Sequence, residues 1–345
     1  MTDPILIIGG SGVLGSAIAR LLRQAHPGLP LVIGARDQQR AAAVAEGLGT
    51  AEPTPVDLTR RDLGLPSGQR YSLIIVALKD TSYNSVRFAQ DRGIGVILMA
   101  EAAFEIAPVV ALHAASPGAA AIALLGHAHG GLAALVAAAL AEPIDDVRAI
   151  RIGLIVDPAD PLPPGALIDM ETIGRIGPPP LALRGGRWIW LKGGAATDFT
   201  LVNAAGDTLP AQAHGLPDVL TLSRFAPGAD IALLGAEGAT VRGPDGRPGH
   251  EIVIEIDIGK NNEALTTRRW RFVDPEGNGV LSARGMMLAA EALAGLRGDR
   301  LPGGLYFPED LTTPDEVVER LAGWGIEVRG ETKVLEASTP SRSGG

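Results

Sequence analysis

Short apolar runs alternate with amphipathic stretches along the first 145 residues of the chain. The apolar runs predict strands at residues 4–10, 29–36, 53–58, 71–78, 94–101 and 120–126. Helical periodicity predicts helices at residues 13–25, 38–49, 81–93 and 131–142. Most of the predicted strands are apolar throughout, as is typical of parallel strands buried on both faces. The alternation therefore predicts an α/β fold with a doubly wound parallel sheet.

The pattern changes to a period of two after about residue 145. Segment 250–260 alternates isoleucine with Glu251, Glu255 and Asp257, which predicts an antiparallel strand with one exposed face. Further strands are predicted at residues 147–156, 187–194, 198–206 and 268–273.

The last part of the chain returns to helical periodicity. Residues 280–298 predict a helix, and residues 302–328 predict a strand, a turn, a helix and a final strand. Thr313 is expected to cap that second helix, which Pro314 opens. The small polar residues at 335–345 predict a disordered tail.

A glycine-rich motif joins the first predicted strand to the first predicted helix. Gly10, Gly12 and Gly15 form G-x-G-x-x-G, and the positions between them hold Ser11, Val13 and Leu14. Gly10 permits a tight turn, Gly12 lets a pyrophosphate approach the backbone, and Gly15 lets the helix pack against the strand. The N–H groups at the helix start then face the anion. This motif predicts a dinucleotide site; the alternative is an ordinary glycine-rich strand–helix turn.

The end of the second predicted strand indicates which dinucleotide is bound. NAD sites usually place an acidic residue there to bind the ribose 2′-hydroxyl, whereas NADP sites use arginine for the 2′-phosphate. Here Arg36 comes first and Asp37 follows it. A guanidinium can hold the phosphate in charge-assisted hydrogen bonds, and Asp37 can instead cap the next helix. NADP is therefore favoured over NAD.

Composition excludes several classes of function. The net charge of −9 argues against a nucleic-acid partner, because phosphate backbones require clustered Lys and Arg. The absence of cysteine excludes disulfides, thiolate nucleophiles and iron–sulfur clusters. Residues 106–141 contain no Asp, Glu, Lys or Arg, but glycines and histidines interrupt them, so a buried strand and helix are predicted rather than a membrane span. No signal peptide is recognised, and a cytoplasmic location is expected.

With these motifs the chain resembles the saccharopine dehydrogenase-like oxidoreductases. The resemblance rests on IIGGSGVLG (7–15), GAR (34–36), VDLTRRD (56–62), SLIIVAL (72–78), FAQDRGIGVILMAE (88–101), GHAHGG (126–131) and PGGLYFPEDL (302–311). It implies a Rossmann-type NADP-binding domain at residues 1–145 and an inserted mixed α+β domain at 146–278, for substrate binding or dimerisation. It also implies that residues 279–334 return to the first domain.

The resemblance further implies reversible hydride transfer with a nicotinamide cofactor. Carried over position by position, the glycine loop and Arg36 would bind this cofactor, Asp57 would lie near the adenine, and Ala77 and Leu78 would lie along the cofactor.

Two sites depart from the family pattern. Ala128 and His129 stand where relatives have Asp and Pro, and Lys79 and Asp80 stand where relatives often have small residues. Both sites follow predicted strands at the sheet edge where ligands bind, so they argue against saccharopine itself as the substrate.

Few side chains are candidates for moving a proton. Lys79 follows the fourth strand and could donate a proton or bind a carboxylate; Glu101 ends the fifth strand and could orient a ribose or an amine. His127 and His129 follow the sixth strand, and histidine titrates near neutral pH. In extended chain they would share a side and could ligate a metal, but no metal site is predicted. The alternative for each is a structural role.

Two arginines of the second domain raise a further question. Arg269 and Arg271 lie on one face of the strand predicted at 268–273. A carboxylate-binding role is open to them, but a solvated sheet edge is the favoured interpretation.

Together these features predict an NADP-dependent oxidoreductase that acts on a C=N or C=O bond of a small metabolite. The alternative is a non-catalytic NADP-binding redox sensor that acts through a protein partner. A homodimer is expected, because exposed sheets of inserted domains often pair.

Overall fold

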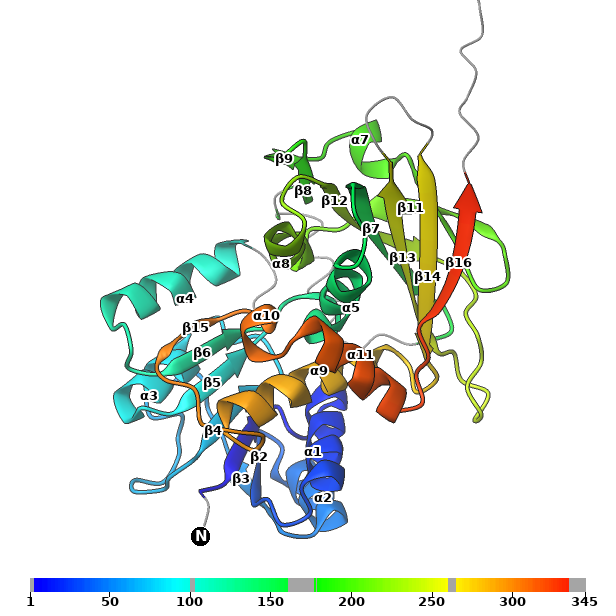
Figure 1. Cartoon of the computed structure of the whole chain (residues 1–345). Coiled ribbons are helices and arrows are strands. Elements are labelled where there is room, and N and C mark those ends of the chain that lie inside the picture. The colour runs from blue at the N-terminus through cyan, green and yellow to red at the C-terminus, as the bar shows by residue number, and fades with distance from the viewer. Residues whose placement is uncertain (1–2, 100–102, 161–176, 178, 260–264, 335–345) are drawn as a thin grey trace, which may run out of the picture.

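The first of two β-sheets consists of seven parallel strands (Figure 1). The computed structural model describes residues 3–99, 103–160, 177, 179–259 and 265–334. The strands of this sheet are β1 (Ile5–Ile8), β2 (Leu31–Ala35), β3 (Ala51–Pro55), β4 (Leu73–Val76), β5 (Gly95–Leu98), β6 (Ala121–Leu124) and β15 (Gly304–Tyr306). Their spatial order is β3-β2-β1-β4-β5-β6-β15. Since the order reverses direction at β1 and β4, the predicted Rossmann-type fold is confirmed.

Helices cover both faces of this sheet. One face carries α1 (Val13–Ala25), α2 (Gln38–Leu48) and α9 (Asn278–Leu293), and the other carries α3 (Asn84–Arg92) and α4 (Ala103–Ala115). Successive strand residues point to opposite faces. Accordingly, Ile5 and Ile7 pack beneath the first group of helices, whereas Leu6 and Ile8 pack beneath the second.

Helix α4 was not predicted from the sequence. It contains Pro108, and proline disfavours a helix interior because it has no N–H to donate. The fully buried side chain of Val109 packs α4 against the sheet all the same. Tertiary packing therefore outweighs the local preference.

The second sheet has nine strands and is mixed. They are β7 (Val147–Val156), β8 (Leu181–Arg184), β9 (Arg187–Trp190), β10 (Phe199–Val202), β11 (Thr208–Ala213), β12 (Asp230–Glu237), β13 (His250–Ile258), β14 (Thr266–Asp274) and β16 (Arg329–Val334). The main order is β10-β11-β12-β7-β13-β14-β16, with β8 and β9 attached to β12. Strands β8, β11 and β12 were not predicted. Strand β12 is buried on both faces along most of its length, so its sequence lacks a clear period of two.

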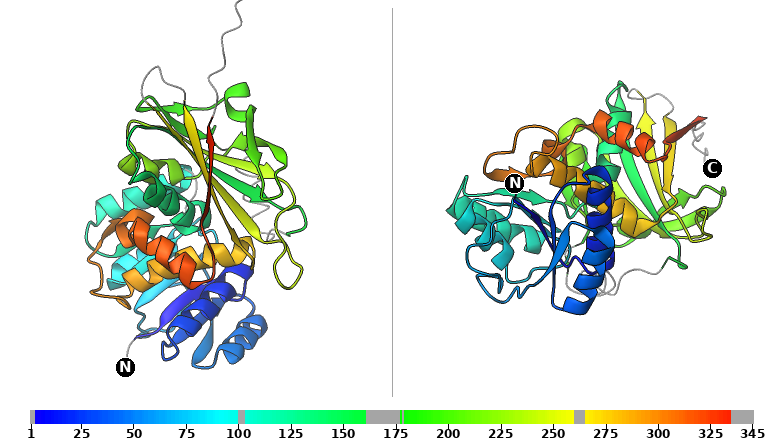
Figure 2. Two further views of the ribbon diagram at one scale, coloured as in Figure 1. Left: turned by 45° about the vertical axis from the view of Figure 1, so that its right-hand side comes forward. Right: turned by 90° about the horizontal axis from the view of Figure 1, so that it is seen from below.

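A layer of helices separates the two sheets (Figure 2). It contains α5 (Leu132–Ala141), α8 (Asp218–Phe225) and α11 (Pro314–Gly323); the short elements η1 (Ala128–Gly131), α7 (Gly194–Thr197) and α10 (Pro308–Leu311) complete the fold. Helix α5 is apolar on all sides because α8, α11 and β7 surround it. The described part of the chain contains no helix with the length and apolar character needed to cross a membrane.

The C-terminal part of the chain contributes to both sheets. Strand β15 pairs with β6 in the first sheet, whereas β16 pairs with β14 in the second. Between them, Thr313 caps α11 as predicted, since its hydroxyl accepts a hydrogen bond from the Glu316 N–H at 3.3 Å. The domain boundaries at residues 145, 278 and 334 stay predictions, and the tail at 335–345 lies outside the described residues.

Strand β13 is antiparallel, but the prediction that one of its faces is exposed was wrong. The strand lies between β7 and β14, and the acidic residues on its second face are buried. Arg151 of β7 donates to Asp257 at 2.7 and 2.8 Å, and Arg269 of β14 donates to Glu255 at 2.6 Å. Cross-strand arginines thus neutralise the acids.

The interpretation of Arg269 and Arg271 as part of a solvated sheet edge was also wrong. Strand β16 covers the outer side of β14. Only about 17% of the Arg269 side chain and 16% of the Arg271 side chain are exposed. Arg271 forms an ion pair with the fully buried Glu251, with 3.4 Å between Nε and Oε1. The alternating charged residues of β13 and β14 therefore form a buried network of ion pairs between neighbouring strands.

We expect Arg151→Met to lower the free energy of unfolding by about 2 kcal/mol, because it leaves Asp257 without a cation and Glu255 with Arg269 alone, both in largely buried positions. Urea unfolding followed by circular dichroism measures the change. Arg268→Met is the matched control, since the Arg268 side chain of β14 is exposed. Equal losses in the two variants would contradict the structural role of the network.

Candidate functional site

The turn between β1 and α1 is so tight that two of its glycines have no room for a side chain. Gly9 has a φ of +79°, which glycine adopts at little cost. A Cβ at Gly10 would lie 2.8 Å from the Ile7 carbonyl oxygen, and one at Gly15 would lie 2.3 Å from the Gly9 carbonyl oxygen. The left-handed turn therefore belongs to Gly9 and not to Gly10, whereas Gly15 provides the predicted close packing of helix on strand.

The start of α1 is an open cradle of backbone N–H groups. Gly12 is its N-cap residue and supplies no capping side chain. Among the described residues, the N–H groups of Val13, Leu14 and Gly15 have no hydrogen-bond acceptor. A Cβ at Gly12 would meet only the Gly9 carbonyl oxygen, at 3.2 Å, so the outer side of the turn is free. This geometry fits the pyrophosphate of a dinucleotide.

Two arginines lie at the end of β2 beside this cradle. Arg36 is exposed, and Arg40 donates a hydrogen bond to the Ser11 carbonyl oxygen at 3.3 Å. Asp37 is the N-cap of α2, and its Oδ1 accepts from the N–H groups of Gln39 and Arg40 at 3.1 Å each. The Asp37 carboxylate is thus engaged in helix capping. Sequence reasoning missed Arg40, although it lies one helical turn after Arg36.

Asp57 follows β3, where the resemblance placed an adenine contact. Its Oδ1 accepts from the N–H of Thr59 at 2.9 Å and from the Thr59 hydroxyl at 2.6 Å. These hydrogen bonds lower the pKa of Asp57. The contact with adenine stays a prediction.

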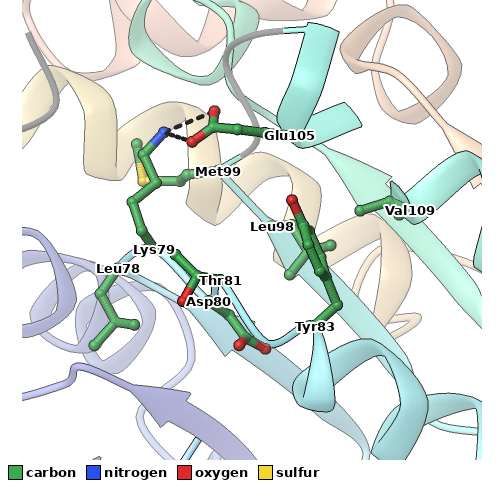
Figure 3. Close-up of a pocket in the computed structure, with 9 residues that line it drawn as sticks. All are labelled: Leu78, Lys79, Asp80, Thr81, Tyr83, Leu98, Met99, Glu105 and Val109. Carbon is green, nitrogen blue, oxygen red and sulfur yellow. Dashed lines mark hydrogen bonds and ion pairs between the residues drawn. The ribbon is translucent and has the colours of Figure 1, made fainter. Parts of the chain in front are cut away.

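A pocket of about 150 Å³ opens at the carboxyl ends of β4 and β5 (Figure 3). It is lined by Leu78, Lys79, Asp80, Thr81, Tyr83, Leu98, Met99, Glu105 and Val109. Leu78 connects the pocket to the glycine turn, because its Cδ2 lies only 3.0 Å from the point that a Cβ on Gly9 would occupy. Ala77 hydrogen-bonds to the Ile8 carbonyl oxygen at 2.9 Å. The pocket and the cradle therefore share the edge of the sheet at which ligands bind in this fold.

Lys79 and Glu105 form an ion pair inside this pocket. The Lys79 Nζ lies 2.9 Å from Glu105 Oε1 and 3.0 Å from Oε2, and about one fifth of each side chain is exposed. Lys79 lines this pocket just after β4, and its role in the site stays a prediction; the structure adds Glu105 and Tyr83 as neighbours that sequence reasoning missed. The predicted site residue Glu101 lies outside the described residues.

His127 and His129 are buried at the junction after β6. His127 Nε2 contacts the Thr221 hydroxyl at 3.0 Å, and Thr221 in turn donates to Glu309 at 2.6 Å. His129 contacts Ser282 through Nδ1 and His250 through Nε2, at 3.2 and 3.0 Å.

Burial lowers the pKa of both histidines. The pKa of His127 falls to about 3, and that of His129 falls well below its usual value, with His250 adding to the effect. The rings contact different partners, so they do not share a side as expected for extended chain. Neither histidine lines the pocket of Lys79, and their catalytic role stays a prediction. Across the described ranges, no cluster of three or more potential metal ligands is found.

A buried aspartate completes this junction. Asp218 of α8 is fully buried, and its Oδ2 accepts from the Ala128 N–H at 2.8 Å. Burial raises the pKa of Asp218 to about 7. Asp218 and Thr221 both belong to α8, so the junction joins η1 to α8 across 90 and 94 residues of chain. No sequence motif marks this pairing.

Comparison with solved structures supports the fold. Saccharopine dehydrogenase (L-Glu forming) from Saccharomyces cerevisiae matches with a TM-score of 0.66 and 11% identity, over 96% of this chain and 100% of that one. Homospermidine synthase from Legionella pneumophila, in complex with NAD, matches with a TM-score of 0.61 and 11% identity, over 100% and 94%. No protein-family model and no curated protein sequence matches the chain. The resemblance is thus confirmed at the level of the fold.

We expect Asp218→Asn to flatten the dependence of stability on pH. Between about pH 4 and pH 7 the native carboxyl keeps a proton that the unfolded chain has released, so the free energy of unfolding falls as pH rises. The parent should lose about 1 kcal/mol per pH unit more than the variant within this window. Thermal unfolding at several pH values measures the slopes. Asp299→Asn, at an exposed position, should behave as the parent does; parallel slopes for the parent and Asp218→Asn would contradict the buried titration.

Proposed function

We propose that this protein is an NADP-dependent oxidoreductase that transfers a hydride to or from a C=N or C=O bond of a small molecule. One observation carries the proposal. The dinucleotide cradle at Gly9–Gly15 and the polar pocket around Lys79 open on the same sheet edge, and Leu78 belongs to both. A cofactor held by the cradle would therefore have its reactive end beside a pocket that can bind a second molecule.

Residues along this sheet edge match successive parts of the cofactor, from the pyrophosphate to the nicotinamide. The free N–H groups of Val13, Leu14 and Gly15 would bind the pyrophosphate, aided by the α1 dipole. Ala77 and Leu78 would border the nicotinamide half, because they extend from β4 over the glycine turn. When bound, the nicotinamide supplies reversible hydride transfer, and the protein supplies orientation and proton movement.

Two features support NADP over NAD. Arg36 and Arg40 place two guanidiniums at the end of β2, where a ribose 2′-phosphate would lie. Asp37 would repel that phosphate or bind a 2′-hydroxyl, and its Oδ1 is engaged in capping α2. The site therefore offers a 2′-phosphate two guanidiniums against one carboxylate.

Lys79 is the pocket group best placed to hold the substrate. Its ammonium is fixed by Glu105 and remains partly exposed to the pocket. We assign it the binding of an electronegative substrate atom next to the reacting carbon. His127 and His129 are less suited to this task, because burial keeps both rings neutral and away from the pocket.

The inserted domain offers a surface for pairing of two copies. Trp188 and Trp190 of β9 are 48% and 51% exposed, which is unusual for large apolar side chains. The exposure of these two side chains supports the proposed homodimer, in which a second copy would bury this strand.

We expect Arg36→Ala to weaken NADPH binding by about 10- to 100-fold, because a charge-assisted contact with the 2′-phosphate is lost. NADH affinity should change by less than about twofold. Fluorescence titration of the two coenzymes measures both effects. The matched control is Arg20→Ala, which removes an exposed arginine from α1. Equal NADPH affinity in parent and Arg36→Ala proteins would remove this residue from the site.

The activity itself is tested by the loss of NADPH absorbance in the presence of ethyl pyruvate or 1-pyrroline. We expect the parent to turn over at least one of these probes, and Lys79→Met to raise KM by about tenfold or more, because a charged contact to the substrate is lost. Binding of NADPH should be unaffected. Tight NADPH binding without turnover of either probe would favour the redox-sensor alternative.

A further inference from the structure

Tyr83 adopts a backbone conformation that is unfavourable for an aromatic residue. It precedes α3 with φ of +54° and ψ of +24°, in the left-handed region. A residue with a bulky side chain enters this region at a cost, and such residues cluster at functional sites. The position of Tyr83 thus calls for a physical reason, which its surroundings provide.

Asp80 holds the turn that imposes this conformation. Its Oδ1 accepts from the Ser82 N–H at 3.0 Å, and its Oδ2 accepts from the Ser85 N–H and hydroxyl at 2.9 and 2.6 Å. The Asp80 carbonyl oxygen accepts from the Tyr83 N–H at 3.2 Å. The Ser82 hydroxyl also donates to the Leu58 carbonyl oxygen at 2.7 Å, which ties the turn to the loop after β3. The turn is therefore rigid, and the direction of the Tyr83 side chain is set by it.

The ring of Tyr83 forms one wall of the pocket that contains Lys79. Figure 3 shows the ring across the pocket from Lys79, with its hydroxyl end toward Glu105. The ring packs against the core beneath α3 and α4, which leaves the hydroxyl at the pocket surface. Within the described part of the chain, this hydroxyl has no hydrogen-bond partner. Burial and the charges of Glu105 and Asp80 raise the pKa of Tyr83, so the phenol carries its proton at neutral pH.

The other two tyrosines do not present an available hydroxyl to the pocket. The hydroxyl of Tyr71 is buried in the core without a partner, and the hydroxyl of Tyr306 donates to the Pro302 carbonyl oxygen at 2.9 Å. Neither lines the pocket. Only Tyr83 combines an available O–H group, a rigid turn and a place beside Lys79.

We propose that the Tyr83 hydroxyl is the proton donor for the reduced heteroatom of the substrate. The inference rests on the proposed function and names the acid of the same site. As a hydride adds to the carbon of a neutral C=O or C=N bond, the π electrons move to the heteroatom. The Tyr83 O–H bond breaks and its proton passes to that heteroatom, while the nicotinamide is oxidised. The phenolate regains a proton from water, and the Lys79 ammonium stabilises it in the interval.

Asp80 is a positioning residue in this scheme. Its carboxylate is occupied by the turn, so it is not available to a substrate. Its hydrogen bonds fix the one backbone geometry that brings the phenol to Lys79 rather than to solvent.

The test compares Tyr83→Phe with Tyr306→Phe and the parent, using NADPH with ethyl pyruvate and with 1-pyrroline at about pH 8, where the imine is neutral. We expect Tyr83→Phe to lower kcat by about 100-fold or more, because the proton donor is lost. The melting temperature and the NADPH Kd should match the parent, since ring and backbone are unchanged. Tyr306→Phe should retain parental kcat.

The outcomes separate this proposal from the broader one. A parent that turns over a probe, with Tyr83→Phe within about threefold of its kcat, would overturn the role of Tyr83 and leave the oxidoreductase intact. A further result against it would be a 100-fold loss of kcat in Lys79→Met together with parental kcat in Tyr83→Phe, since lysine would then be the acid. A parent that binds NADPH but turns over neither probe would overturn the proposed function and the proton-donor role together.

Discussion

The contact between α1 and the glycine turn is the constraint on which the site depends. The first turn of α1 lies so close to the tip of β1 that a Cβ at Gly15 would lie 2.3 Å from the Gly9 carbonyl oxygen. No side chain fits in that space, so the helix can approach only because Gly15 has none. The approach points the free N–H groups of α1 into the crevice between β1 and β4. An anion placed there meets backbone donors and the positive end of a helix dipole.

The parallel sheet brings four distant segments to the same crevice. The glycine turn follows β1, the arginines follow β2, the pocket residues follow β4, and Glu105 lies near the start of α4. Because every strand runs in the same direction, all of these groups emerge at one edge. The protein is acidic overall, yet Arg36, Arg40 and Lys79 place positive charge along this edge. Asp37, Asp80 and Glu105 lie at the same edge, so it holds charges of both signs.

The polar groups away from the crevice join the two sheets into one structure. Acids of β13 are neutralised by arginines of β7 and β14, and the histidines after β6 bond to α8 and β13. Burying a charge or a polar atom costs free energy unless it has a partner. These pairings therefore constrain how β13 and α8 sit against the rest of the chain. They also show that a charged or titratable residue in this sequence can serve a structural role.

Local patterns in the sequence were sufficient for the Rossmann-type sheet, the glycine cradle and the capping of α11 by Thr313. Each of these follows from neighbouring residues: apolar runs, glycine spacing and a side chain that reaches its own helix. The pocket, the burial of His127 and His129, and the pairing of Glu255 with Arg269 depend on residues that are distant in the chain or on facing strands. Period-two alternation is the same for a solvated face and for one covered by a partner strand, so only the tertiary structure decided that β13 is buried. Likewise, no sequence motif marks Tyr83. The turn held by Asp80 places its ring in the wall of the pocket, which Glu105 also lines.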